Sequence, residues 1–321
     1  IVMPMLHLLK KFSARKRRRC EMSAYHIPVL LEESVSALAV RENGVYVDAT
    51  FGGGGHSRAI LQRLGSKGRL MVFDKDYEAF ANLPDDDRVI AVNNNFRFIH
   101  NYVRYHGFEK VDGIIADLGV SSHQFDTSER GFSFRFDAPL DMRMNLDARK
   151  SARDIVNSYT FEELERIFRI YGEVDDSRKV AELICRAREI SPIETTEDLG
   201  RALESVLPKF SEHKFLAKVY QALRIETNDE MRDLEGLMKG VIHSLKSGGI
   251  VSVISYHSLE DRIVKNFLRA GNATGRIERD LMGHGSSPFE LVNKKPIIPG
   301  EDEIAGNTRA RSAKLRVAKR R

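Results

Sequence analysis

VYVDATFGGGGHS, residues 45–57, is the most informative segment of the chain. It starts as a short apolar run that ends on Asp48 and continues through four consecutive glycines. It then leads into residues 58–64, where Ile60, Leu61 and Leu64 recur at helical spacing. A buried strand, a glycine-rich turn and a helix in this order are typical of an α/β protein with a doubly wound parallel sheet.

Apolar runs of the same kind follow along the chain. Residues 70–73, 89–92 and 113–116 have the length of buried strands, and the first and last of these runs are followed by Asp74 and Asp117. The segments between them are long enough for crossover helices. The sequence therefore predicts a parallel sheet with acidic side chains at the edge where ligands of this fold bind.

The strand pattern stops between residues 125 and 225, where helical signals take over. A capping box at Thr160 predicts a helix that ends at Gly172. The α/β pattern returns with an apolar helix, which we expect Gly248-Gly249 to end, and with a buried strand at 250–255. We therefore expect one α/β domain, residues 25–124 and 226–321, interrupted by a helical substrate-docking domain, residues 125–225, without metal-ligand spacing.

The composition indicates a globular protein with a polyanionic partner. The 321 residues are 42% hydrophobic and 30% charged, and the net charge is +5. Seven Lys or Arg lie within residues 309–321, and five lie at 15–19, in a segment (1–24) that we interpret as an extension or a disordered tail. No apolar stretch approaches the ~20 residues of a membrane span. Two cysteines without a CxxC spacing fit a cytosolic compartment.

The glycine run lets a ligand approach the backbone closely. The dinucleotide fingerprint G-x-G-x-x-G is broken at Ser57, which leaves a nicotinamide-dependent dehydrogenase as a distant alternative. The lysine of a phosphate-binding loop is also missing after the run. The remaining common ligand is S-adenosylmethionine, with its carboxylate on the loop and its ribose hydroxyls on Asp74.

Asp117 follows the last strand of the first half and is the candidate catalytic residue. An Asp in this place could also cap the next turn. A carboxylate that accepts a hydrogen from the exocyclic N4 of a cytosine would favour a pyramidal nitrogen and stabilise the charge that develops during methyl transfer. Methylation at C5 would require a thiolate. Cys20 and Cys185 both lie away from the strand ends, which argues against C5 chemistry.

Ordered motifs along residues 25–321 resemble the bacterial 16S ribosomal RNA cytosine-N4 methyltransferases, the MraW family. The motifs are HIPVLLEE (26–33), DATFGGGGHS (48–57), DLGVSS (117–122), GFSF (131–134), PLDMRM (139–144), QALRI (221–225), HSLEDR (257–262), KP (295–296) and RARSAKLRVA (309–318). The resemblance implies a Rossmann-like class I S-adenosylmethionine-dependent methyltransferase sheet with an inserted all-helical domain. It also implies N4-methylation of a decoding-centre cytosine in 16S ribosomal RNA of the small ribosomal subunit.

The family's site residues carry over to the positions that match its motifs. The implied cofactor contacts are Gly54, Gly55, His56, Asp74, Phe96, Asp117 and Gln124. One stretch departs from the pattern, because residues 215–220 read FLAKVY where many members carry Pro-Ala-Thr-Arg-Thr. His56 and His257 adjoin predicted strand ends, so we expect both to line the site.

Two other functions fit the same residues. An amine methyltransferase that acts on DNA would need the same cofactor loop and the same acceptor carboxylate. A ribosome assembly factor could bind the cofactor without catalysis. Naked RNA and an assembled subunit are both compatible substrates, and the sequence has no signal for a particular oligomeric state.

Overall fold

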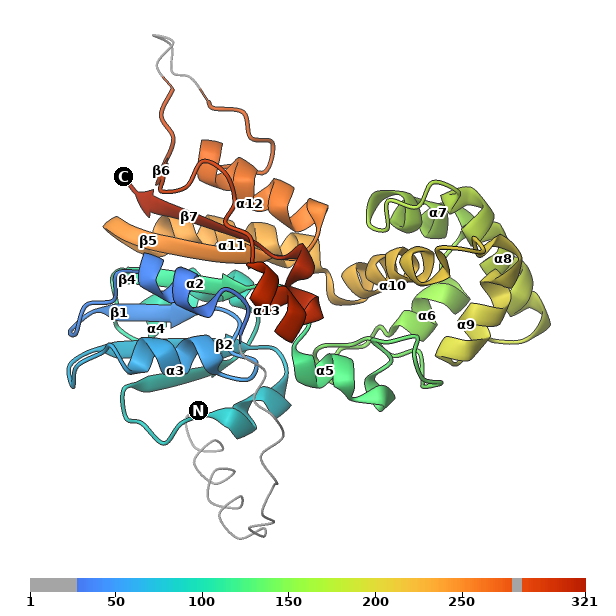
Figure 1. Ribbon diagram of the computed structural model, residues 1–321, viewed down its shortest axis with the longest axis horizontal. Helices are drawn as coiled ribbons and strands as arrows, with labels where there is room; N and C mark the ends of the chain where they lie inside the picture. The colour runs from blue at the N-terminus through green and yellow to red at the C-terminus, as the bar shows by residue number, and fades with distance from the viewer. Residues whose placement is uncertain (1–27, 279–284) are drawn as a thin grey trace, which may run out of the picture.

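The structure is a computed structural model that describes residues 28–278 and 285–321 (Figure 1). The predicted tail, residues 1–24, lies outside the described residues. A sheet lies at the centre of one lobe, and a group of helices forms a second lobe beside it (Figure 1). The seven strands are β1 Val45–Asp48, β2 Arg69–Asp74, β3 Val89–Asn93, β4 Val111–Asp117, β5 Leu245–Ser255, β6 Phe289–Leu291 and β7 Lys314–Arg320.

The strand order is β3-β2-β1-β4-β5-β7-β6. The first five strands run parallel, whereas β7 pairs antiparallel with both β5 and β6. The order reverses at β1, which pairs with β2 on one side and β4 on the other, so the loops after these three strands meet at one edge. The predicted Rossmann-like α/β sheet is confirmed.

Helices cover both faces of the sheet, as the continuous apolar strands require. On one face, α2 (Leu31–Ala37) and α3 (Gly55–Leu61) pack with Tyr46, Leu70 and Val72. On the other face, α4 (Ile99–Tyr105), α11 (Glu230–Ser244) and α12 (Ser258–Ala270) pack with Val47 and Met71. Neighbouring residues of one strand thus enter opposite halves of the core.

The boundary between α11 and β5 differs from the prediction. The helix ends at Ser244, and β5 already begins at Leu245, so Gly248 and Gly249 lie inside the strand instead of ending the helix. Gly248 has a φ of 80°, and the pairing of β4 with β5 shifts register between Val111 and Gly113. The glycines therefore accommodate an irregularity within the strand, which a pattern of glycine after an apolar helix does not distinguish from a helix end.

The second lobe lies between β4 and β5 in the chain and has a hydrophobic core of its own. Its buried residues run from Phe132 to Leu223, without a member from the sheet. Its helices are α6 Ala152–Ser158, α7 Phe161–Ile170, α8 Ser177–Ile190, α9 Thr196–Leu203 and α10 Glu212–Asn228. The predicted capping box at Thr160 is present at the start of α7. In the described part of the chain, no helix is long and apolar enough to cross a membrane.

Short elements complete the described chain. The remaining α-helices are α5 Ser122–Asp126 and α13 Glu301–Gly306, and the 3-10 helices are η1 Tyr77–Asn82, η2 Phe96–Phe98, η3 Ser128–Arg130, η4 Glu204–Val206 and η5 Thr308–Ser312. Several of them follow the carboxyl ends of strands: η1 follows β2, η2 follows β3, and α5 follows β4. These elements carry the candidate site.

Candidate active site

The glycine loop between β1 and α3 needs three of its four glycines, for two different reasons. Gly52 and Gly54 have φ angles of 49° and 74°, which L side chains rarely adopt. At Gly55 a Cβ atom would lie 2.0 Å from Cγ of Pro28, which leaves no room for any side chain. A Cβ on Gly53, by contrast, would meet nothing within 4 Å. The loop therefore packs tightly against the protein at Gly55 and leaves open space at Gly53.

Asp48, the last residue of β1, is hydrogen-bonded to residues on both sides of the glycines in this loop. Its carboxylate accepts hydrogen bonds from the hydroxyl of Ser57 at 2.6 Å and from the backbone N–H of Thr50 at 3.1 Å. Burial raises the pKa of Asp48, against the influence of the neighbouring His56. His56 is itself buried, and its Nε2 has no hydrogen-bond partner among the described residues. The buried carboxyl group of Asp48 and the unpaired Nε2 of His56 therefore both lie next to the glycine loop.

Asp74 ends β2 next to the same loop. Its two oxygens accept hydrogen bonds from the backbone N–H groups of Gly52, at 2.9 Å, and Asp76, at 2.8 Å. Burial raises the pKa of Asp74 to about 6, although both hydrogen bonds oppose the shift. The carboxylate is thus tied to the glycine loop and still has lone pairs for a further donor.

Phe96 opens η2, just after β3, on the neighbouring strand. Its ring is partly buried against the sheet core, and the ammonium group of Lys75 lies 5.9 Å from the ring centroid. Lys75 directly follows Asp74 and pairs with the buried Asp233 at 2.9 Å. The structure therefore brings the Phe96 ring to the same edge of the sheet as Asp74, as their places after neighbouring strands predict.

Asp117 ends β4, and its carboxylate has two different neighbours. The hydroxyl of Tyr256 donates a hydrogen bond to Oδ1 at 2.7 Å, and Nδ1 of His56 lies 3.9 Å from Oδ2. The side chain is 24% exposed. Burial raises the pKa of Asp117 to about 6, although His56 and the Tyr256 hydrogen bond act in the opposite direction. The group is therefore ionised near neutral pH and can act as an acceptor.

Gln124 lies apart from these contacts. Its side chain completes the capping box of α5 by accepting from the backbone N–H of Ser121, and it donates to Asp76 at 2.8 Å. Arg130, which the sequence did not single out, is buried and contacts the same carboxylate of Asp76 at 3.0 Å. Gln124 thus fixes the loop after β4 to the loop after β2, and its contact with a cofactor stays a prediction.

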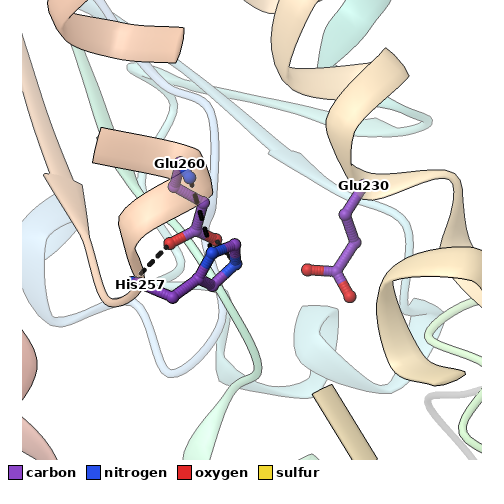
Figure 2. A group of neighbouring side chains, drawn as sticks. All are labelled: Glu230, His257 and Glu260. Carbon is purple, nitrogen blue, oxygen red and sulfur yellow. Dashed lines mark hydrogen bonds and ion pairs between the residues drawn. The ribbon is translucent and has the colours of Figure 1, made fainter. Parts of the chain in front are cut away.

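His257 caps the amino end of α12, and its expected place in the lining of the site stays a prediction. With Glu230 and Glu260 it forms a group whose candidate ligand atoms lie within 4.8 Å of one another (Figure 2). Arg224 donates two hydrogen bonds to the Glu230 carboxylate, at 2.8 and 2.9 Å, and Glu260 accepts from the backbone N–H groups of Tyr256 and His257. Because both carboxylates already have protein donors, the group fits an internal ion-pair network better than a metal site.

Neither Tyr256 nor Arg130 was singled out from the sequence, and only one of these two residues has a sequence signal that could have identified it. Tyr256 directly follows β5, so the same rule that selected Asp74 and Asp117 would have found it. Arg130 has no such signal, because its partner Asp76 belongs to a different loop.

The comparisons with known proteins agree with the geometry. The model of the MraW methylase family matches residues 23–321. A protein of Parabacteroides distasonis named "Ribosomal RNA small subunit methyltransferase H" is 54% identical over 299 residues, which cover 93% of this chain and 98% of the relative. Proteins of the same name from Bacteroides fragilis (53% identity, 94% and 99% covered) and Flavobacterium johnsoniae (51% identity, 92% and 98% covered) are similarly close. The resemblance seen in the sequence motifs is thereby confirmed, and the chain belongs to the MraW methylase family.

Proposed function

We propose that this protein methylates the exocyclic N4 of a decoding-centre cytosine in 16S ribosomal RNA, with S-adenosylmethionine as the donor. The observation that carries the proposal is the carboxylate of Asp117, partly exposed at the end of β4 and fixed by Tyr256 beside the glycine loop. The names of the relatives supply the substrate class, a ribosomal RNA of the small subunit. The family supplies the reaction type, a methylation.

The residues at the strand ends fit the cofactor. Gly53 leaves open space on the loop, whereas a Cβ atom on Gly54 or Gly55 would meet Phe51 or Pro28, so these two glycines let the loop pack closely on the protein. Asp74 retains lone pairs for the ribose hydroxyls, and the Phe96 ring lies at the same edge for the adenine. The buried Nε2 of His56 has no protein partner among the described residues and can take one from the ligand. When bound, S-adenosylmethionine supplies an electrophilic methyl group.

Asp117 orients and activates the target amine. The N4 lone pair of cytosine is delocalised into the ring, so the nitrogen attacks poorly until a hydrogen-bond acceptor favours its pyramidal form. The Asp117 carboxylate accepts one N4 hydrogen and stabilises the positive charge that develops on nitrogen. A pKa of about 6 keeps the carboxylate ionised at neutral pH while leaving it basic enough to take the proton afterwards.

The helical lobe and the basic C-terminal segment are the proposed RNA-binding parts. We propose residues 125–225 as the docking domain and residues 25–124 with 226–321 as the methyltransferase domain, in the cytoplasm. A flipped base must enter the site at the strand ends, and the lobe is inserted directly after β4, which ends there. The small ribosomal subunit is the proposed partner.

Mass spectrometry of ribosomal RNA nucleosides, with and without the active gene, tests the proposed product. N4-methylcytidine should appear in 16S ribosomal RNA only with the active gene. Assays of the purified protein with free ribosomal RNA, with assembled subunits and with DNA show whether RNA or DNA is the substrate. Methylation of DNA alone would favour the DNA enzyme, and cofactor binding without any methylation would favour an assembly factor.

Substitutions of Asp117 test the proposed mechanism. Asp117→Ala should lower the single-turnover rate at saturating cofactor by ~100–1,000-fold, the usual loss for one preorganised polar group at a transition state. Asp117→Asn should lose less, because its amide oxygen still accepts one hydrogen bond. A near wild-type rate for Asp117→Ala would exclude the proposed role.

A further inference from the structure

Tyr256 is held in place at both its hydroxyl and its backbone. The hydroxyl donates to Oδ1 of Asp117 at 2.7 Å, and the backbone N–H donates to the buried Glu260 carboxylate at 2.8 Å. The ring passes close to the loop after β4, where a Cβ atom on Gly119 would lie 3.5 Å from Cδ2 of Tyr256. Tyr256 therefore contacts Asp117 and lies beside the loop that follows Asp117.

Glu260, which accepts from the backbone N–H of Tyr256, is itself held by neighbouring residues, of which His257 is drawn in Figure 2. His257 caps α12 by accepting from the backbone N–H of Glu260, and Nε2 of His257 lies 3.2 Å from Oε1 of Glu260. Arg224, at the end of the helical lobe, binds Glu230 at the start of α11. Although burial opposes ionisation, His257 and Arg224 hold the pKa of Glu260 below its ordinary value. Glu260 is therefore a charged and fixed acceptor for Tyr256.

We propose that Tyr256 is a positioning residue for methyl transfer: by occupying Oδ1 of Asp117, it directs Oδ2 toward the target amine. The inference rests on the proposed function of Asp117. A carboxylate with two free oxygens can rotate about its Cβ–Cγ bond and offer either one to a donor. The hydrogen bond from Tyr256 removes this freedom, so that one defined oxygen remains for the N4 hydrogen.

Tyr256 has a second effect on Asp117, through charge. A donor to the carboxylate stabilises its ionised form, so the hydroxyl lowers the pKa of Asp117 against the effect of burial. The other titratable groups that face Asp117 are His56 on α3, Asp48 on β1 and Glu260 on α12. Burial and the charge of Asp117 raise the pKa of Tyr256 itself, so its hydroxyl keeps the proton that it donates.

Tyr256→Phe tests this role, because it removes the hydroxyl and keeps the ring. At pH 8.5, where Asp117 is ionised in either protein, the single-turnover rate should fall about tenfold, less than for a group that touches the reacting atoms. The acidic limb of the pH–rate profile should move upward by about one pH unit. The same movement should appear in the cofactor-free protein, as the titration midpoint of the Asp117 carboxyl carbon in NMR spectra of selectively labelled samples.

Tyr46→Phe is the matched control. Tyr46 is buried on β1, and its hydroxyl accepts from the backbone N–H of Arg41 at 2.8 Å, remote from Asp117. The Tyr46→Phe substitution should leave the pH–rate profile and the titration of Asp117 unchanged. A slower Tyr256→Phe with an unmoved limb and an unmoved titration would reduce Tyr256 to a packing role and overturn the inference. A wild-type rate for Asp117→Asn would instead refute the role of Asp117, while the NMR titration, which needs no activity, would still decide whether Tyr256 tunes it.

Discussion

Asp117→Asn should make the protein more stable at neutral pH while it slows methyl transfer. The pKa of Asp117 is about 6 against an ordinary value of 3.8, because burial disfavours its ionised form. A displacement of about two pH units corresponds to about 3 kcal/mol between the two protonation states. Because the side chain is 24% exposed, water offsets part of this cost. We expect the ionised carboxylate to cost about 1–3 kcal/mol of folding free energy.

The pH dependence follows from the direction of the shift. The folded protein holds the Asp117 proton more tightly than the unfolded chain does, so the stability from this group is complete below pH ~4 and is lost as the pH rises through about 6. The asparagine variant has no proton to lose. Its free energy of unfolding, relative to wild type, should therefore increase by about 1–2 kcal/mol between pH 4.5 and pH 8. Urea denaturation at the two pH values measures this difference.

Asp86→Asn is the control with the opposite shift. Hydrogen bonds from Arg88 lower the pKa of Asp86 to about 2, so this carboxylate is ionised in both folded and unfolded chains from pH 4.5 to pH 8. The difference from wild type should stay constant over this range. If the Asp117→Asn difference were equally constant, Asp117 would not be a destabilised acid, and its assignment as a basic acceptor near neutral pH would lose its physical ground.

The other predictions concern the cofactor and the RNA. Asp74→Ala should weaken S-adenosylmethionine binding by ~1.5–3 kcal/mol, the scale of a hydrogen bond to a charged group, and unchanged affinity in calorimetric titration would remove Asp74 from the site. Neutralising the exposed Arg311 and Lys319 should make the logarithmic salt dependence of RNA binding shallower, by about 0.7–0.9 for each RNA phosphate that these side chains neutralise. Arg316→Gln should instead lower stability, because Arg316 pairs with Asp261 at 2.7 Å; equal salt slopes for all these variants would assign the C-terminal charges to solubility.

The parallel part of the sheet could be predicted because its inner strands β1, β2 and β4 are buried on both faces. Such strands read as continuous apolar runs, and β1 to β4 were placed within one or two residues at most ends. The strand β6, Phe289–Leu291, has three residues, two of them exposed, so it has no hydrophobic pattern to detect. It exists because β7 offers an edge to pair with, and this is a tertiary cause that a local pattern does not contain.

The acids of the site could be predicted for a topological reason, and their partners could not. Asp74 and Asp117 end strands that lie on either side of β1, so the fold itself brings the two acids to one edge of the sheet. The bond from Tyr256 to Asp117 joins residues 139 positions apart, and that pairing depends on side-chain geometry. Gln124 lies in the segment after β4, as expected, but its side-chain amide already bonds to Asp76 and Ser121. Its contact with a cofactor therefore stays a prediction.

The buried acids at the strand ends carry an energetic cost that a bound ligand would offset. Asp48, Asp74 and Asp117 converge at the ends of β1, β2 and β4, and burial raises the pKa of each. Lys75, which directly follows Asp74, pairs with Asp233 instead of with these acids. Such a cluster lowers stability unless a bound partner brings hydrogen-bond donors or positive charge. The sulfonium and ribose hydroxyls of S-adenosylmethionine and the amine of a cytosine supply both, so ligand binding should offset the penalty that folding leaves at this edge of the sheet.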